Sequence, residues 1–124
     1  MNARSASPVF HVSDLDRAIQ FYTTILGFTE SFRVGSYRGL KRGEIELHLT
    51  VGGGGDYRRP IGGGTVYILC DSVDSYYESI IARGAKPSSA PSDTPYGMRD
   101  FVVHDPDGNQ LSFGADKADV GLTY

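Results

Sequence analysis

Apolar positions recur with helical spacing in two stretches of the chain. In each stretch they fall on one face of a helix: Leu15, Ala18, Ile19, Tyr22, Ile25 and Leu26 in the first, and Val73, Tyr76, Tyr77, Ile80 and Ile81 in the second. Ser13 suits the N-cap of the first helix, and Asp71 or Ser72 suits that of the second. Gly27 and Gly84 stand where helices commonly end. The pattern therefore predicts two amphipathic helices.

Strand-like segments flank both predicted helices. In the first half they cover residues 9–12 before the helix and residues 28–34, 37–42 and 44–51 after it. In the second half they cover residues 66–70, 98–103 and 110–114, with one irregular edge strand expected within residues 85–97. The segment Asp105-Pro106-Asp107-Gly108-Asn109 has the composition of a tight turn and predicts a hairpin between the last two strands. Each half thus has the order β-α-β-β-β.

The two halves also correspond in sequence. Val12-Ser13-Asp14-Leu15-Asp16 matches Cys70-Asp71-Ser72-Val73-Asp74 at an offset of 58 residues, since 70 minus 12 is 58. A repeat of this kind indicates two copies of one unit packed together. We expect an α+β fold in a single domain over residues 1–124. It divides into module one (5–51), a flexible glycine-rich linker (52–64), module two (65–115) and a C-terminal tail (116–124).

One face of each predicted sheet is left free of its helix. The alternation in residues 44–49 turns Ile45, Leu47 and Leu49 toward the helix and Glu44, Glu46 and His48 to the opposite, open face. By the same alternation and the repeat, the open faces carry a mixed apolar and polar set: Ser7, Val9, His11, Glu46, His48, Thr65, Tyr67, Leu69 and Ser112. We expect these faces to curve around a cavity suited to holding a ligand.

Composition narrows the functional classes. The net charge is -3 and the pI is about 5.5, which argues against nucleic acid as a partner. No apolar run approaches the roughly 20 residues of a membrane span, so no membrane partner is expected. The single cysteine, Cys70, excludes an internal disulfide. Residues 1–7 lack the apolar core of a signal peptide, and a cytoplasmic protein is the default expectation.

The duplicated β-α-β-β-β pattern resembles the vicinal oxygen chelate superfamily. This superfamily includes glyoxalase I, extradiol dioxygenases, fosfomycin-resistance enzymes and bleomycin resistance proteins. The matching segments are Val12-Ser13-Asp14-Leu15, Phe21-Tyr22, Ile25-Leu26-Gly27-Phe28 and Asp105-Pro106-Asp107-Gly108-Asn109. The resemblance implies a curved mixed sheet around a cleft, but it does not specify the reaction, because one scaffold hosts several chemistries.

The resemblance also implies four possible metal-ligand positions, which correspond here to Ser7, Glu46, Thr65 and Ser112. Metal-dependent members usually carry His, Glu or Gln, His, and Glu at these positions. One remaining carboxylate cannot hold a catalytic divalent ion, which normally needs about three protein ligands. We therefore expect no metal and no other cofactor. The alternative is a relocated metal held by His11, Glu46 and His48.

Within the superfamily, the chain is most similar to the bleomycin resistance branch. The segment Pro95-Tyr96-Gly97-Met98-Arg99-Asp100-Phe101 resembles that branch, in which an aromatic residue between Pro and Gly flanks the binding groove. Tyr96 takes that position, and Tyr37 and Tyr67 match further aromatic positions. The absence of tryptophan departs from the drug-binding members, so the resemblance does not specify the drug. It implies a homodimer with grooves between module one of one chain and module two of the other.

The sequence thus predicts a metal-free protein that binds and sequesters a small molecule, a drug or antibiotic included, with a planar or aromatic ligand as partner. No catalytic residue is predicted. The predicted ligand-binding residues are Tyr96, Tyr67, Tyr37, His11, Glu46, His48, Leu69 and Ser112. The first alternative is a glyoxalase-like lyase or dioxygenase with an atypical metal site. The second is a metal-free enzyme that uses Glu46 as a general base.

Overall fold

The computed structural model describes residues 1–51 and 60–117 and contains the two predicted β-α-β-β-β modules. Module one comprises β1 (Val9–Val12), α1 (Leu15–Gln20), the π-helical turn η1 (Phe21–Ile25), β2 (Thr29–Val34), β3 (Tyr37–Arg42) and β4 (Ile45–Val51). Module two comprises β5 (Thr65–Leu69), α2 (Val73–Ala82), β6 (Ser92–Asp93), β7 (Met98–His104) and β8 (Gln110–Asp116). The predicted α+β fold is confirmed.

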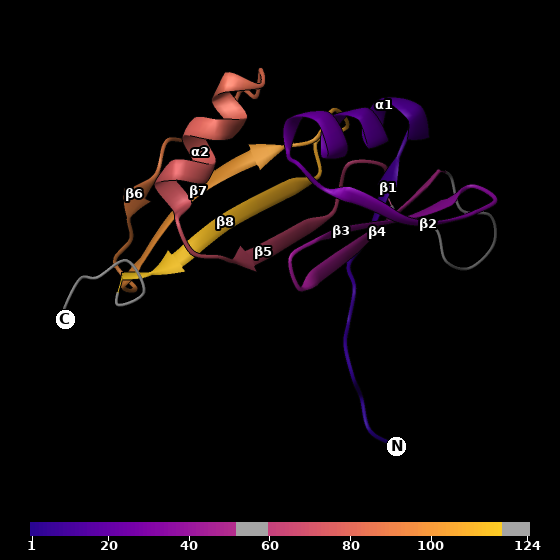
Figure 1. The fold of residues 1–124 in the computed structure, drawn as a ribbon, viewed down its shortest axis with the longest axis horizontal. Helices are drawn as coiled ribbons and strands as arrows, with labels where there is room; N and C mark the ends of the chain where they lie inside the picture. Colours follow the sequence, from indigo (N-terminus) through magenta and orange to yellow (C-terminus); the bar gives the residue numbers. More distant parts are fainter. Residues whose placement is uncertain (52–59, 118–124) are drawn as a thin grey trace.

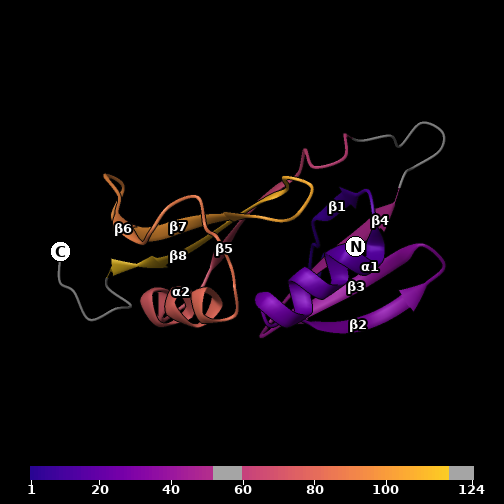
Figure 2. The ribbon, with the colours of Figure 1, turned by 90° about the horizontal axis from the view of Figure 1, so that it is seen from above.

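Each module forms one four-stranded mixed sheet, and the two sheets lie side by side (Figures 1 and 2). The strand orders are β1-β4-β3-β2 and β5-β8-β7-β6, with the first pair of each sheet parallel. Helices α1 and α2 lie next to each other on the same side of the molecule (Figure 1). The hydroxyl of Tyr76 on α2 donates to the carbonyl of Leu26 just after η1, at 2.7 Å.

The core lies between the helices and the sheets. Its buried side chains include the residues expected on the helix side of the strands: Phe10, Val12, Leu47, Leu49, Leu111 and Phe113. The alternate residues of the same strands point to the open faces, because neighbouring residues in a strand face opposite ways. Tyr67 and Leu69 are exposed on β5, and Glu46 and His48 are half-buried on β4. The predicted division into helix-side and open faces is confirmed for these strands.

The start of the first helix differs from the prediction, and the start of the second matches one of the two predicted N-caps. Asp14, not Ser13, is the N-cap of α1, and its carboxylate accepts from the main-chain N–H of Arg17 at 3.1 Å. Ser72 is the N-cap of α2, but its side chain makes no capping hydrogen bond and its φ is +50°. The helical pattern in module one was interpreted as one helix, yet it changes to a π-helical turn at Phe21.

The turn after β7 joins the two modules. Asp107 accepts from the main-chain N–H of Ser13 at 3.1 Å and from its hydroxyl at 2.6 Å. The buried carboxylate of Asp105 accepts from the hydroxyl of buried Tyr22 at 2.9 Å. Asn109 donates to the carbonyl of His11 at 3.2 Å. The hairpin was predicted, but its role as the contact between modules was not.

The predicted linker is described only in part. Residues 52–59 and 118–124 lie outside the described residues, so flexibility there stays a prediction. Residues 60–64 are held in place, since the N–H of Gly62 donates to the His11 carbonyl at 3.0 Å and that of Gly64 to Asn109 Oδ1 at 2.8 Å. Within the described parts of the chain, no helix is both long and apolar enough to span a membrane.

Candidate ligand-binding faces

A pocket of about 490 Å³ lies where the open faces of the two modules meet. It is lined by residues 5–8 of the N-terminal arm, by residues 41 and 44–47 of module one and by residues 66–69 of module two. The volume falls within the range of about 300–1,000 Å³ that is usual for small-molecule sites. Three of the predicted ligand-binding residues line this pocket: Glu46, Tyr67 and Leu69.

A hydrogen-bonded chain crosses the open face of module one. The hydroxyl of Tyr37 lies 2.8 Å from His48 Nδ1, and His48 Nε2 lies 2.8 Å from Glu46 Oε1. The hydroxyl of Ser31 donates to Glu46 Oε2 at 3.3 Å. The sheet register explains why these side chains meet. Tyr37 on β3 pairs with Thr50, which follows His48 by two residues on β4, and Glu46 precedes His48 by two residues. The structure therefore connects Tyr37 and His48 to the pocket through Glu46.

The direction of the protons along this chain follows from Glu46. The hydrogen bond to His48 lowers the pKa of the Glu46 carboxyl, and Lys41 nearby acts in the same direction. An ionised carboxylate only accepts, so His48 Nε2 carries the hydrogen. In the neutral imidazole Nδ1 is then the acceptor, and the Tyr37 hydroxyl donates to it. Burial raises the pKa of the Tyr37 phenol, which keeps it protonated as this arrangement requires.

An aromatic cluster surrounds His48. The ring of Phe32 stacks on that of Tyr37 with centroids 6.0 Å apart, and it meets the imidazole of His48 edge-on at 5.1 Å. Gly39 makes this possible, since a Cβ built there would lie 2.2 Å from the Phe32 ring. The ring therefore lies across the sheet over a residue that has no side chain. Such packing holds the imidazole in one orientation.

The open face of module two carries a second cluster, built around Asp100. The hydroxyls of Tyr67 and Tyr96 both donate to Asp100 Oδ2, at 3.0 and 2.8 Å. The hydrogen bond to Asp100 is the main cause that raises the pKa of the Tyr96 phenol. For Tyr67, burial contributes most and the bond to Asp100 comes next, and together they raise its pKa strongly. Two exposed aromatic rings thus converge on one carboxylate.

A glycine also shapes this second cluster. Tyr67 crosses from the edge strand β5 over β8, where a Cβ at Gly114 would lie 2.1 Å from its hydroxyl oxygen. Asp100 pairs with Gly114 in the sheet, so the hydroxyl arrives beside the carboxylate. Ser112 pairs with Tyr67 on the same face, but it is buried and lies outside the pocket lining.

The structure brings Glu46 and His48 of the alternative metal site together, but it does not add His11 as a third ligand. His48 uses both ring nitrogens toward Tyr37 and Glu46, while His11 pairs with Thr50 on the neighbouring strand and is buried. Within residues 1–51 and 60–117, no three His, Cys, Asp or Glu side chains are arranged to hold a metal ion. His11 Nδ1 is buried and has no hydrogen-bond partner among the described residues.

Sequence reasoning missed two residues that organise these faces, Phe32 and Asp100. Phe32 stands at no position that the family resemblance singled out, and Asp100 lies within the resembling segment 95–101 but was given no role there. A signal was present in the strands, because Gly39 and Gly114 interrupt otherwise ordinary strand segments. A glycine inside a strand often marks a close approach by another group, and here that group is an aromatic ring in both modules.

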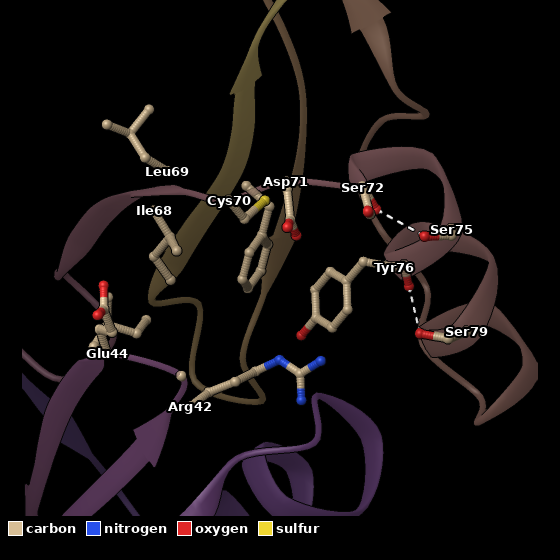
Figure 3. A pocket seen from close by; sticks show the side chains of 13 residues that line it. Arg42, Glu44, Ile68, Leu69, Cys70, Asp71, Ser72, Ser75, Tyr76 and Ser79 are labelled. Atoms are coloured by element: carbon tan, nitrogen blue, oxygen red, sulfur yellow. Dashed lines mark hydrogen bonds between the residues drawn. The ribbon is translucent and has the colours of Figure 1, made fainter. Parts of the chain in front are cut away.

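A larger pocket of about 800 Å³ lies on the helix side of the junction between modules (Figure 3). Its helix wall carries the hydroxyls of Ser72, Ser75 and Ser79. Ser75 and Ser79 donate to main-chain carbonyls of α2, at 3.0 and 2.7 Å. Of the predicted ligand-binding residues, only Leu69 lines this pocket.

Arg42, the cationic side chain that lines the helix-side pocket, makes contacts that stabilise the fold. The guanidinium of Arg42 donates to the carbonyl of Gly27 at 2.9 Å and lies 4.9 Å from the centroid of the Tyr76 ring (Figure 3). It therefore ties the end of β3 to the segment after η1 and to α2. The candidate site is accordingly the pair of open faces with the smaller pocket between them.

Comparison with known proteins agrees with this architecture. The family model described as Glyoxalase/Bleomycin resistance protein/Dioxygenase superfamily matches residues 6–113. A bleomycin resistance protein of Geobacillus stearothermophilus is 28% identical over 121 residues, which cover 86% of this chain and 92% of that protein.

Two solved structures show the same fold. The bleomycin resistance determinant encoded on the transposon Tn5 has a TM-score of 0.77 at 23% identity, over 93% of this chain and 99% of that one. The bleomycin-binding protein of Streptomyces verticillus, solved with copper(II)-bleomycin, has a TM-score of 0.76 at 24% identity, over 93% and 98% of the two chains.

Proposed function

The chain belongs to the Glyoxalase/Bleomycin resistance protein/Dioxygenase superfamily, and from that premise we propose that it binds and sequesters a planar small molecule without transforming it. The observation that carries the proposal is the pair of aromatic and carboxylate clusters on the open faces, with a pocket between them. Flat rings give contact area at low cost in conformational entropy. Fixed polar groups beside the rings orient what they hold.

The bleomycin resistance protein that is 28% identical makes bleomycin the first ligand to try. A metal-free site, a homodimer with grooves shared between chains and a cytoplasmic location are further parts of the proposal. The exposed apolar side chains of Val9, Leu69 and Tyr96 support a surface that a second chain or a ligand covers. Light scattering that gives twice the 13.4 kDa chain mass would support the homodimer.

The experiment is a calorimetric titration of the full chain with bleomycin and a panel of planar drugs, with recovery of each ligand for mass spectrometry. Sequestration predicts saturable binding and a ligand recovered chemically unchanged. Tyr96→Ala should weaken binding about tenfold, roughly 1.4 kcal/mol, because it removes one exposed aromatic wall. Ile81→Ala is the matched control, since Ile81 is an exposed apolar side chain on the helix layer.

Two outcomes contradict the proposal. A chemically altered ligand would make the protein an enzyme, and metal analysis of the purified chain would then separate the metal-dependent alternative from the general-base one. Unchanged affinity in Tyr96→Ala would remove Tyr96 from the site. Thermal unfolding of each variant distinguishes lost binding from lost folding.

A further inference from the structure

We propose that the ligand presents N–H or O–H donors to both open faces, because the tyrosines and carboxylates there offer almost only hydrogen-bond acceptors. The inference rests on the proposed binding function and specifies its ligand class. It concerns five side chains that the two modules contribute separately: Tyr37, Glu46, Tyr67, Tyr96 and Asp100.

Each of the three phenols has a single hydrogen to donate, and each already donates it within the protein. Tyr67 and Tyr96 donate to Asp100 at 3.0 and 2.8 Å. The Tyr37 hydroxyl lies 2.8 Å from His48 Nδ1 and donates to it in the neutral form of the imidazole. Their oxygens retain lone pairs that can only accept. A phenol that usually both donates and accepts is thus restricted to one role at all three positions.

The carboxylates of Glu46 and Asp100 are also hydrogen-bond acceptors. Glu46 accepts from His48 and Ser31, and Asp100 accepts both phenol hydrogens on Oδ2. Among residues 1–51 and 60–117, nothing donates to Oδ1 of Asp100, which leaves this oxygen as an acceptor for a ligand. Lys41 is the only cationic side chain among the residues that line the pocket between the faces, and it is exposed. A ligand carboxylate or phosphate would meet acceptors at each cluster.

The ligand class that fits is a planar compound with amide, amidine or amino groups at its edge. Its ring can lie on the exposed faces of Tyr67 and Tyr96 while its N–H groups reach the phenol and carboxylate oxygens. A ketone, ester or carboxylate of the same shape leaves those acceptors unpaired, and a desolvated acceptor without a donor is costly.

The test compares two neutral probes of matched shape, 2-naphthamide and 2-acetylnaphthalene, in which an NH₂ group replaces a methyl group. NMR titration of the full chain at pH 8 keeps an ordinary imidazole neutral. We call the proposed preference for ligands with N–H or O–H groups the donor rule. It predicts that the amide binds at least about fivefold more tightly than the ketone, as one or two extra hydrogen bonds imply. The hydrophobic effect alone favours the ketone, so the two accounts predict opposite preferences.

Asp100→Asn should reduce this preference. The asparagine amide brings two donors and keeps one uncharged acceptor oxygen, so the phenol hydrogens are held less firmly and can point into the groove. We expect the amide-to-ketone affinity ratio to fall at least about threefold. Asp16→Asn is the control, because Asp16 is an exposed carboxylate on α1, on the helix layer.

The outcomes separate the two proposals. Equal affinity for the two probes, or a preference for the ketone, contradicts the donor rule and leaves the binding function standing. A ratio that Asp100→Asn leaves unchanged also contradicts the rule, provided that the variant unfolds at the wild-type temperature. Absence of binding by either probe counts against the groove and hence against both proposals.

Discussion

The open faces of the two modules both place an aromatic ring over a glycine, but they hold that ring differently. In both, a glycine inside the sheet lets an aromatic ring lie across the strands, Phe32 over Gly39 in module one and Tyr67 over Gly114 in module two. In module one the ring is half-buried and packs on two further rings. In module two the ring is 43% exposed and is held by one hydrogen bond to Asp100. The first face is a fixed wall, and the second can adjust to what it binds.

The difference follows from what each ring contacts, because both rings come from edge strands, Phe32 from β2 and Tyr67 from β5. The hydrogen-bonded chain of module one includes Glu46 and His48 on the central strand β4, which has neighbours on both sides. Tyr67 comes from the edge strand β5, and Tyr96 comes from the segment before β7. Phe32 packs against Tyr37 and His48 on the central strands β3 and β4, whereas Tyr67 is held through its hydroxyl by Asp100. A similar repeat therefore produces one preorganised face and one adaptable face.

The largest expected effect comes from adding a side chain at the two glycines. Gly39→Val should destabilise the protein by about 1–3 kcal/mol, as overpacking of a well-packed site does, because the Phe32 ring cannot move without disturbing Tyr37 and His48. Gly114→Val should cost less, since the exposed Tyr67 ring can swing outward. Urea unfolding of both variants measures the difference. Equal losses would show that the two faces are equally rigid.

A second prediction distinguishes the effect of Asp100 from that of burial on the pKa values of the three tyrosines. The bond to Asp100 raises the pKa of Tyr96 and adds to the effect of burial on Tyr67, whereas burial alone raises that of Tyr37. Asp100→Asn should therefore move the ionisation of Tyr67 and Tyr96 to lower pH and leave Tyr37 in place. Ultraviolet titration of phenolate in wild type and variant, with Tyr37→Phe to assign its contribution, provides the check. A shift of Tyr37 in Asp100→Asn would contradict the separation.

The sequence predicted the modules and their faces well, because those depend on local periodicity. Leu47 and Leu49 alternate with Glu46 and His48, and that alternation alone assigns the faces. It could not reveal that Asp100 collects two phenol hydrogens, since the residues involved are up to 33 positions apart in the chain. Nor could it show that His48 turns both nitrogens to protein partners, because that depends on sheet register and on the ring of Phe32.

The smallest expected effect concerns acid. The hydrogen bond from His48 lowers the pKa of Glu46 below its ordinary value of 4.5, so folding favours the ionised form. The stability from this pair is fully present above that ordinary value and is lost as the pH falls through the lowered one. The difference in thermal midpoint between wild type and Glu46→Gln should therefore shrink as the pH falls below about 4.5. A difference that grows in acid would reverse the assignment.

The most direct test of the central claim is to map where 2-naphthamide binds, from the NMR chemical shifts of the labelled full chain. Binding at the open faces predicts that the perturbed residues cluster around Glu46, Tyr67 and Asp100, with Tyr96→Ala reducing the affinity. The helix-side pocket, marked by Ser75 and Ser79, should show no response. Perturbations confined to the surroundings of Ser75 and Ser79 on α2 would place the binding site in the helix-side pocket and contradict the account.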